Sequence, residues 1–287
     1  MRITFPVVVT AGPLSLSAHL IFESLAYAIG FYIYSRSRRL NGDFLSPSDR
    51  FSVITAAVIG AALGSRILYW FEDPILTLRH IFEPFYLLVG KTVVGGLLGG
   101  TFAVEWVKRR AGIARRTGDL FAIPIVVGMA IGRIGCFLEG LPDHTYGIAT
   151  ALPWGVDFGD GIHRHPTQLY EALFLVALAF WLRRPRYREG DRYRTFLLAY
   201  LTFRLAIDFF KPGVAFAGLT CIQWACAIGI LTYWRDVPFI LAPVRGWFPW
   251  ATESVPISST TPPLPSALSA TAALTPKSSL PTKTSIS

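Results

Sequence analysis

Charged residues are scarce in this chain of 287 residues, because they make up 16% of it while hydrophobic residues make up 52%. Soluble domains carry about 25% charged residues, so this composition excludes an ordinary soluble globular protein. The 21 Phe, 11 Tyr and 8 Trp residues add to the apolar character. The composition therefore predicts a membrane protein.

Cysteine is also rare, and the three that occur have no paired spacing. Cys136, Cys221 and Cys226 all lie in apolar stretches. This pattern indicates neither a disulfide framework nor a metal site. We interpret all three as small buried residues.

Apolar stretches long enough to cross a hydrocarbon core recur along the chain. A membrane-spanning helix needs about 17 to 25 residues. Candidate windows lie at 14–34, 52–71, 84–106, 119–138, 166–183, 195–211 and 217–234. The sequence therefore predicts an all-α polytopic membrane protein with about seven transmembrane helices. A re-entrant or tilted segment is the alternative for the short fifth or sixth window.

Basic residues are concentrated in alternate loops. Those after the first, third and fifth windows are Arg36, Arg38, Arg39, Arg50, Lys108, Arg109, Arg110, Arg115, Arg116, Arg183, Arg184, Arg186, Arg188, Arg192 and Arg194. The other loops hold only Arg79, Arg164 and Lys211. By the positive-inside rule, the chain begins outside the cytoplasm and ends within it. Attraction to anionic lipids explains the basic runs, and we expect no nucleic-acid partner.

Two regions outside these windows have distinctive compositions. Residues 251–287 are rich in Ser, Thr, Pro and Ala. We expect them to form a disordered cytoplasmic tail after a transmembrane domain at 1–250. The outer connection at 141–164 is rich in Gly, Pro and Asp. We expect it to form a loop region that caps a site opening outward.

Several charged residues fall inside the predicted spans or at their edges. The basic ones are Arg66, Lys91, Arg133 and Arg204, and the acidic ones are Glu23, Glu139, Glu171 and Asp208. A charge at the bilayer centre costs at least about 2.5 to 3.5 kcal/mol, so each basic group needs a partner or a watery cavity. Arg204 and Asp208 are four positions apart and can pair on one helix face. Arg133 and Glu139 do not share a face, so Arg133 needs a different counterion.

These polar groups gather at a similar depth near the outer surface. The start of the fifth window adds Arg164, His165, Gln168, Tyr170 and Glu171. An excess of positive charge there predicts an anionic ligand, and a lipid phosphate suits arginine at this depth. A proton or ion relay is the alternative use of buried charges. An ion-coupled transporter would have internal repeats, and none is evident in the sequence.

Three motifs carry a resemblance to a known family. GRIG at 132–135, RHPTQLYE at 164–171 and YLTFRLAIDFFKP at 200–212 resemble the prolipoprotein diacylglyceryl transferase family. The resemblance extends from about Gly12 to Trp234. It implies a multi-pass enzyme of the bacterial inner membrane, with a periplasmic N-terminus and a cytoplasmic C-terminus. The family moves the diacylglyceryl group of phosphatidylglycerol onto the lipobox cysteine thiol of a prolipoprotein signal peptide, and it needs no metal or cofactor.

The resemblance also implies roles for individual residues. Arg133 and Arg204 match the two arginines of the family's motifs, and Asp208 stands where the family usually has Glu. The other matching residues are Arg66, Gly95, Gly96, His165, Gln168, Tyr170, Glu171 and Tyr200. With Lys91, Glu23 and Asp208, they form the expected substrate-binding and catalytic set.

The chain departs from the family pattern at several of these positions. Val94 replaces the usual His, Cys136 replaces an Asn, and Glu139 and Leu141 occupy positions where the family has Asn and Glu. Glu23 aligns best with the Tyr expected in the first span. A non-catalytic lipid-binding or lipid-moving relative is therefore the alternative function.

The expected chemistry needs an anion-binding group and a base. The thiolate is the nucleophile, and the phosphate ester that leaves needs fixed cations. We expect Arg133 and Arg204 to bind this phosphate, supported by Arg66 and Lys91. His165, Glu139 and Glu171 are the candidate bases. Alternatively, Glu171 anchors an arginine and His165 caps the fifth span.

Overall fold

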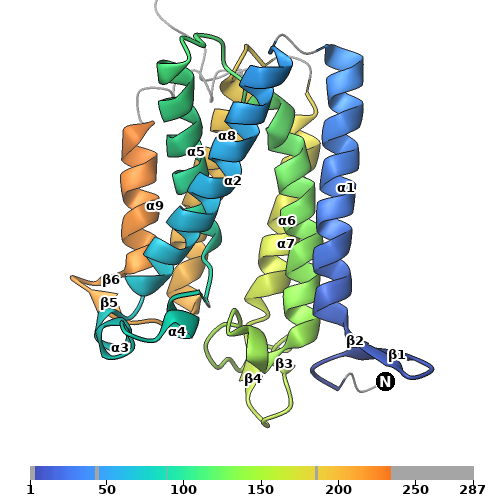
Figure 1. Ribbon diagram of the computed structural model, residues 1–287. Helices are drawn as coiled ribbons and strands as arrows, with labels where there is room; N and C mark the ends of the chain where they lie inside the picture. Colours follow the sequence, from blue (N-terminus) through green and yellow to red (C-terminus); the bar gives the residue numbers. More distant parts are fainter. Residues whose placement is uncertain (1–3, 43–44, 89, 185–186, 234–287) are drawn as a thin grey trace, which may run out of the picture.

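The computed structural model describes residues 4–42, 45–88, 90–184 and 187–233, and this part of the chain is mostly helical. Its long helices run side by side in one bundle (Figure 1). They are α1 Ala18–Asn41, α2 Pro47–Trp70, α5 Val93–Arg110, α6 Asp119–Glu139, α7 Thr167–Leu182, α8 Asp191–Ile207 and α9 Cys221–Thr232. Each overlaps one predicted window, so the helical class is confirmed.

Two helices in the described ranges are long and apolar enough to cross a membrane. They are α2 and α6, while α7 and α9 are apolar but shorter. Crossing by all seven helices stays a prediction. The predicted tail at 251–287 lies outside the described residues.

Short elements connect the helices at the end of the bundle where α1 begins (Figure 1). Three antiparallel hairpins are formed by β1 Val8–Ala11 with β2 Leu14–Ser17, β3 Val156–Asp157 with β4 His163–Arg164, and β5 Ala215–Phe216 with β6 Leu219–Thr220. The short helices are α3 Pro74–Arg79, α4 Pro84–Leu88, η1 Leu141–Asp143 and η2 Asp208–Phe210. The connection at 141–164 therefore contains η1 and the β3–β4 hairpin.

The third window was predicted as one span from residue 84, and this prediction is wrong. The chain forms α4, leaves the helical path and begins α5 only at Val93. Gly90 has a φ of 83°, which favours glycine, and its backbone lies against the ring of Tyr69. The Thr92 hydroxyl then accepts the amide proton of Gly95 and caps α5. Lys91 consequently lies before the helix.

Close backbone contacts join α2 to α5. A Cβ atom on Gly64 would lie 2.4 Å from the carbonyl oxygen of Gly95, and one on Gly60 would lie 2.6 Å from that of Gly99. Small residues at such crossings let helices approach closely. These glycines therefore act as packing positions between α2 and α5.

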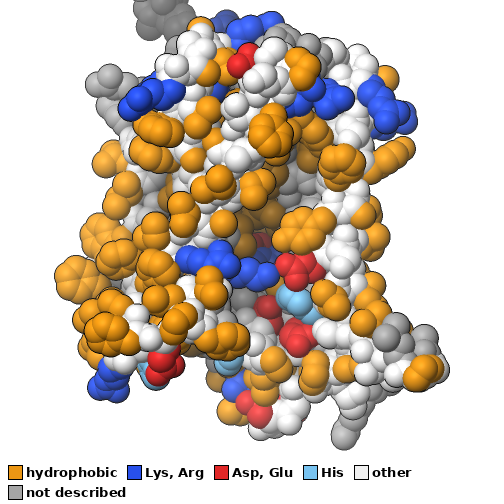
Figure 2. Space-filling model, in the orientation of Figure 1, with side chains coloured by type: hydrophobic (Ala, Val, Ile, Leu, Met, Phe, Trp, Pro, Cys, Tyr) orange, Lys and Arg blue, Asp and Glu red, His pale blue; other side chains and the backbone are white. Residues whose placement is uncertain are grey.

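The remaining helices form the other part of the bundle. Helix α1 packs on α6, α6 packs on α7, and α8 contacts α6, α7 and α9. The core lies among α6, α7, α8 and α9, where Leu175, Phe196, Leu197 and Leu201 are fully buried. Helices α1 and α2 thus pack on different partners. Figure 2 shows a hollow between them, with Lys, Arg, Asp, Glu and His side chains along its lower half.

Candidate functional site

The buried carboxylate of Glu171 in α7 lies at the centre of the candidate site. It is 0% exposed and joins three helices. Its Oε1 atom accepts a hydrogen bond of 2.7 Å from the Tyr200 hydroxyl and lies 2.9 Å from Nε of Arg133. Its Oε2 atom accepts a hydrogen bond of 3.3 Å from Nη1 of Arg204. The counterion that the sequence left open for Arg133 is therefore Glu171.

A second carboxylate ties the same site to α9. Nη2 of Arg204 lies 3.2 Å from Oδ1 of Asp208, which confirms the predicted pair. The other oxygen of Asp208 accepts a hydrogen bond of 2.5 Å from the Thr220 hydroxyl. Thr220 forms a capping box with Gln223 at the start of α9. The five residues Arg133, Glu171, Tyr200, Arg204 and Asp208 are called the buried charge cluster below.

Lys211, which the sequence predicts only as a loop residue, adds a third cation. Its Nζ atom lies 4.0 Å from Oε2 of Glu171, and its side chain is 8% exposed. Three cationic side chains therefore face two carboxylates when all are ionised. A buried site with an excess positive charge favours an anion.

One residue beside the cluster and one within it have unused hydrogen-bonding capacity. Gln168 lies one turn before Glu171 and is 0% exposed. Its amide nitrogen and oxygen, and Nε of Arg204, have no hydrogen-bond partner within the described ranges. Unpaired buried polar groups are costly, so these atoms are available to a ligand or to water.

Further ion pairs connect α1 to the segment before α5. Nζ of Lys91 lies 2.9 Å from Oε1 of Glu23. Nε2 of His19 lies 3.6 Å from the other oxygen of Glu23. The Arg66 guanidinium donates to the carbonyl of Ala62 at 3.2 Å, while its Nε is buried without a partner in the described residues.

The candidate bases occupy different surroundings. Glu139 accepts a hydrogen bond of 2.6 Å from the Ser17 hydroxyl, at the start of α1. His165 is buried, with its Nδ1 atom 3.3 Å from the hydroxyl of Tyr170 and its ring against Phe210. The predicted cap is wrong, because Pro166 occupies the N-cap of α7 and no side chain caps it. Glu171 instead has the anchoring contacts.

Gly95 and Gly96, which are neighbours in α5, face different surroundings. A Cβ atom at Gly95 would lie 2.3 Å from the carbonyl oxygen of Gly64, so Gly95 faces the crossing with α2. At Gly96 the nearest atom would be 3.6 Å away. Val94 is 1% exposed and belongs to the apolar core. This is the position where the family that the sequence resembles has histidine. No proton acceptor therefore occupies it.

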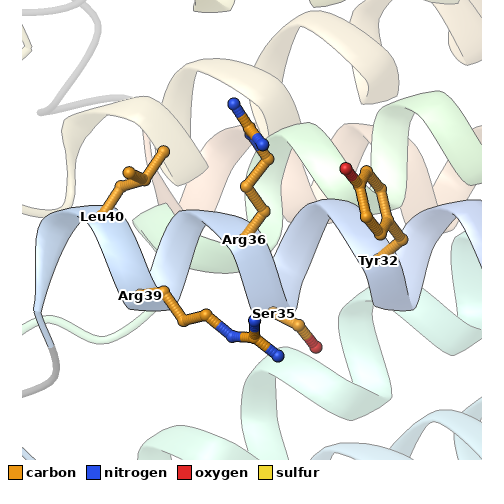
Figure 3. Close-up of a pocket in the computed structure, with 5 residues that line it drawn as sticks. All are labelled: Tyr32, Ser35, Arg36, Arg39 and Leu40. Atoms are coloured by element: carbon orange, nitrogen blue, oxygen red, sulfur yellow. The ribbon is translucent and has the colours of Figure 1, made fainter.

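A separate pocket lies near the other end of α1. Its volume is about 210 Å³, and it is lined by Tyr32, Ser35, Arg36, Arg39 and Leu40 (Figure 3). All five lining residues belong to α1, and none is a predicted site residue. The pocket therefore contributes nothing to the buried charge cluster.

Outside the helices, two acidic groups show opposite electrostatic effects. Burial raises the pKa of Glu72, which follows α2, to about 7. The exposed Asp160 accepts a hydrogen bond from Arg164 at 2.7 Å, and this contact lowers the pKa of Asp160. Arg164 also lies over the ring of Tyr146, so it is held in the outer loop region.

Comparison with known proteins places these features in a family. The family model described as prolipoprotein diacylglyceryl transferase matches residues 6–234. A phosphatidylglycerol–prolipoprotein diacylglyceryl transferase of Bordetella parapertussis is 33% identical over 83% of this chain and 92% of its own length. The enzyme of the same name from Geobacter sulfurreducens is 36% identical over 70% of this chain and 82% of its own. That of Wolbachia pipientis is 33% identical over 72% and 81%.

Proposed function

Because the chain belongs to the prolipoprotein diacylglyceryl transferase family, we propose that it moves the diacylglyceryl group of phosphatidylglycerol to the lipobox cysteine of a prolipoprotein. The observation that carries this proposal is the convergence of Arg133 and Arg204 on Glu171 from different helices. Their remaining guanidinium N–H groups supply the donors that a phosphodiester needs.

The buried charge cluster supports a division of labour in phosphate binding. Glu171 holds both guanidinium groups and acts as a positioning residue, because its two oxygens already accept from Tyr200, Arg133 and Arg204. The arginines bind the headgroup phosphate and stabilise the charge that develops as it leaves. Lys211 and the Gln168 amide complete the polar surroundings.

The reaction is a displacement at the glycerol carbon that carries the phosphate ester. The cysteine thiol gives its proton to a base, and the sulfur forms a new bond to this carbon. The carbon–oxygen bond to the phosphate breaks, and its electron pair leaves with glycerol phosphate. Glu139 and His165 are the candidate proton acceptors in the outer half of the bundle, because Glu171 is fully buried.

The apolar surface supports a multi-pass arrangement in the inner membrane. Only 11% of the most apolar window of α2 is buried inside the protein, so another apolar medium must cover the rest. The loops with many Lys and Arg residues lie at the end of the bundle opposite the hairpins (Figure 1). We propose seven spans, with the hairpins and N-terminus in the periplasm and the C-terminus in the cytoplasm.

A reconstituted assay tests the function directly. Purified full-length protein is mixed with phosphatidylglycerol vesicles and a peptide that contains a lipobox cysteine. Mass spectrometry should detect the peptide with an added diacylglyceryl group, and a peptide with Ser in place of the cysteine should stay unmodified. Absence of product with folded protein would contradict the proposal.

One observation favours a second candidate, a lipid-binding relative without transferase activity. Val94 is buried in the apolar core, and it occupies the sequence position where the family usually has histidine. On this alternative, the protein binds phosphatidylglycerol but leaves the peptide unmodified. The same assay separates the two functions when vesicle binding is measured in parallel.

A further inference from the structure

His19 lies in the first turn of α1, at the end of the bundle that carries the hairpins (Figure 1). Its side chain is 26% exposed, so the imidazole ring is accessible to a substrate. The Ser17 hydroxyl accepts the amide proton of His19 at 3.1 Å and donates its own proton to Glu139 at 2.6 Å. These contacts cap α1 and fix the backbone that carries the ring.

One carboxylate lies near each nitrogen of the His19 ring. Nδ1 lies 3.9 Å from Oδ1 of Asp143, and Nε2 lies 3.6 Å from Oε2 of Glu23. Nζ of Lys91 lies 2.9 Å from the other oxygen of Glu23 and holds this carboxylate in place. A ring that accepts a proton therefore gains a favourable electrostatic contact on both sides.

Asp143 is held so that one of its oxygens faces Nδ1 of His19. The Thr145 hydroxyl donates a hydrogen bond to Oδ2 of Asp143, which leaves Oδ1 toward the ring. The Thr145 carbonyl accepts a hydrogen bond of 2.7 Å from the Thr167 hydroxyl at the start of α7. Nδ1 is buried and has no hydrogen-bond partner within the described ranges. A closure of about 1 Å lets it donate to Asp143, and catalytic contacts of this kind often tighten when substrate binds.

Cys136 connects this ring to the proposed phosphate-binding site. Its Sγ atom, a carboxylate oxygen of Asp143 and a ring nitrogen of His19 lie within 4.8 Å of one another. The same Sγ atom lies 3.9 Å from Nη1 of Arg133. A thiol beside His19 is therefore close to the glycerol carbon of a lipid whose phosphate is bound by Arg133.

We propose, on the basis of the proposed function, that Nε2 of His19 accepts the proton of the prolipoprotein cysteine thiol and that Asp143 positions the ring through Nδ1. A base oriented by a carboxylate on its second nitrogen is a recurring arrangement in enzymes that activate a nucleophile. The S–H bond breaks, the proton moves to Nε2, and the sulfur keeps the electron pair. The sulfur then bonds to the glycerol carbon, while the phosphate leaves with the electron pair of the broken carbon–oxygen bond. The partly exposed ring finally returns its proton to water.

The other candidate bases are less suited to this step. The Glu139 carboxylate already accepts the hydrogen bond that fixes the start of α1. His165 is 8% exposed, so a peptide thiol reaches it less readily than it reaches His19. Val94 provides no proton acceptor at the start of α5. His19 thus supplies the imidazole that α5 lacks.

Two lipobox peptides that differ in the acidity of the reacting group test this role. A selenol is ionised at neutral pH, so a peptide with selenocysteine in place of the cysteine needs no base. His19→Gln should reduce transfer to the cysteine peptide by about 100- to 10,000-fold, the usual contribution of a general base, and transfer to the selenocysteine peptide by less than about tenfold. His163→Gln is the matched control, because His163 is exposed in β4, and it should keep both rates.

Asp143→Asn tests the positioning role with the size of the side chain kept. It should lower the rate with the cysteine peptide at least about tenfold, while the rate with selenocysteine and the unfolding temperature stay unchanged. Equal losses with both peptides in His19→Gln, or a full rate with the cysteine peptide, would refute the role of His19 and leave the proposed function intact. No transfer to either peptide by the folded, unmodified protein would contradict the proposed function and the role of His19 together.

Discussion

Nε of Arg133 lies 2.9 Å from Oε1 of Glu171, and this ion pair joins α6 to α7 inside the bundle. Glu171 is fully buried, so solvent does not compensate either charge. The same carboxylate also accepts from Tyr200 and Arg204 on α8. One side chain therefore determines where two guanidinium groups lie.

Glu171→Gln should strongly destabilise the protein. The substitution removes a charge that compensates Arg133 and Arg204, and breaking a buried pair from one side costs about 3 to 5 kcal/mol. Thermal unfolding of the purified protein in detergent measures the loss. Glu83→Gln is the control, because the Glu83 side chain is exposed and such pairs contribute about 0 to 1 kcal/mol. Equal stability of the two variants would contradict the central role of Glu171.

Arg133→Lys and Arg204→Lys test phosphate binding with the positive charge kept. Lysine lacks the planar fork that arginine presents to a carboxylate and a phosphate. We expect transfer to fall by about 100- to 1,000-fold, the range seen when one donor to a developing anion is removed. Initial rates of peptide modification measure the effect.

Arg79→Lys is the matched control, because Arg79 is exposed on α3 away from the cluster. It should keep the rate of the unmodified protein. A full rate in both cluster variants, with normal unfolding temperatures, would remove these arginines from the mechanism.

Much of the architecture could be predicted because it depends on local patterns. Apolar windows located the seven long helices of the described ranges, and spacing identified the pair of Arg204 with Asp208. The break before α5 escaped prediction because an apolar run does not reveal a turn. Its signal was available in Gly90 and Thr92, a glycine followed by a potential N-cap.

The partners across the bundle could not be predicted in the same way. Glu171 with Arg133, and His19 with Cys136 and Asp143, are brought together by packing between helices that are distant in sequence. Periodicity predicts on which face of its own helix a residue lies. It does not predict which other helix packs against that face. The three cysteines have no paired spacing, which favours small buried residues, yet Cys136 is partly exposed.

Adjacent glycines in α5 offer a test that separates packing from substrate binding. Gly95→Ala would place a Cβ atom 2.3 Å from the carbonyl oxygen of Gly64, so α2 and α5 must separate. We expect a loss of about 1 to 3 kcal/mol in stability, as for other overpacked sites. Gly96→Ala meets its nearest atom at 3.6 Å and should unfold like the unmodified protein.

The affinity of Gly96→Ala for phosphatidylglycerol vesicles then tests the binding role that the resemblance implies for this residue. A weaker affinity for phosphatidylglycerol vesicles at unchanged stability would support that role. Equal unfolding temperatures for the Gly95 and Gly96 variants would contradict the packing of α2 on α5.

Glu72 should make stability depend on pH, because burial raises the pKa of its carboxyl from 4.5 to about 7. Between these values the unfolded chain binds fewer protons than the folded protein, so stability falls as pH rises. Glu72→Gln removes this loss of stability. The unfolding temperature of the variant minus that of the unmodified protein should therefore grow from pH 4.5 to 7 and then stay constant. Glu189→Gln should show the opposite sign, since the hydrogen bond from Arg115 lowers the pKa of Glu189. An advantage of Glu72→Gln that does not change with pH would show that its carboxyl titrates normally.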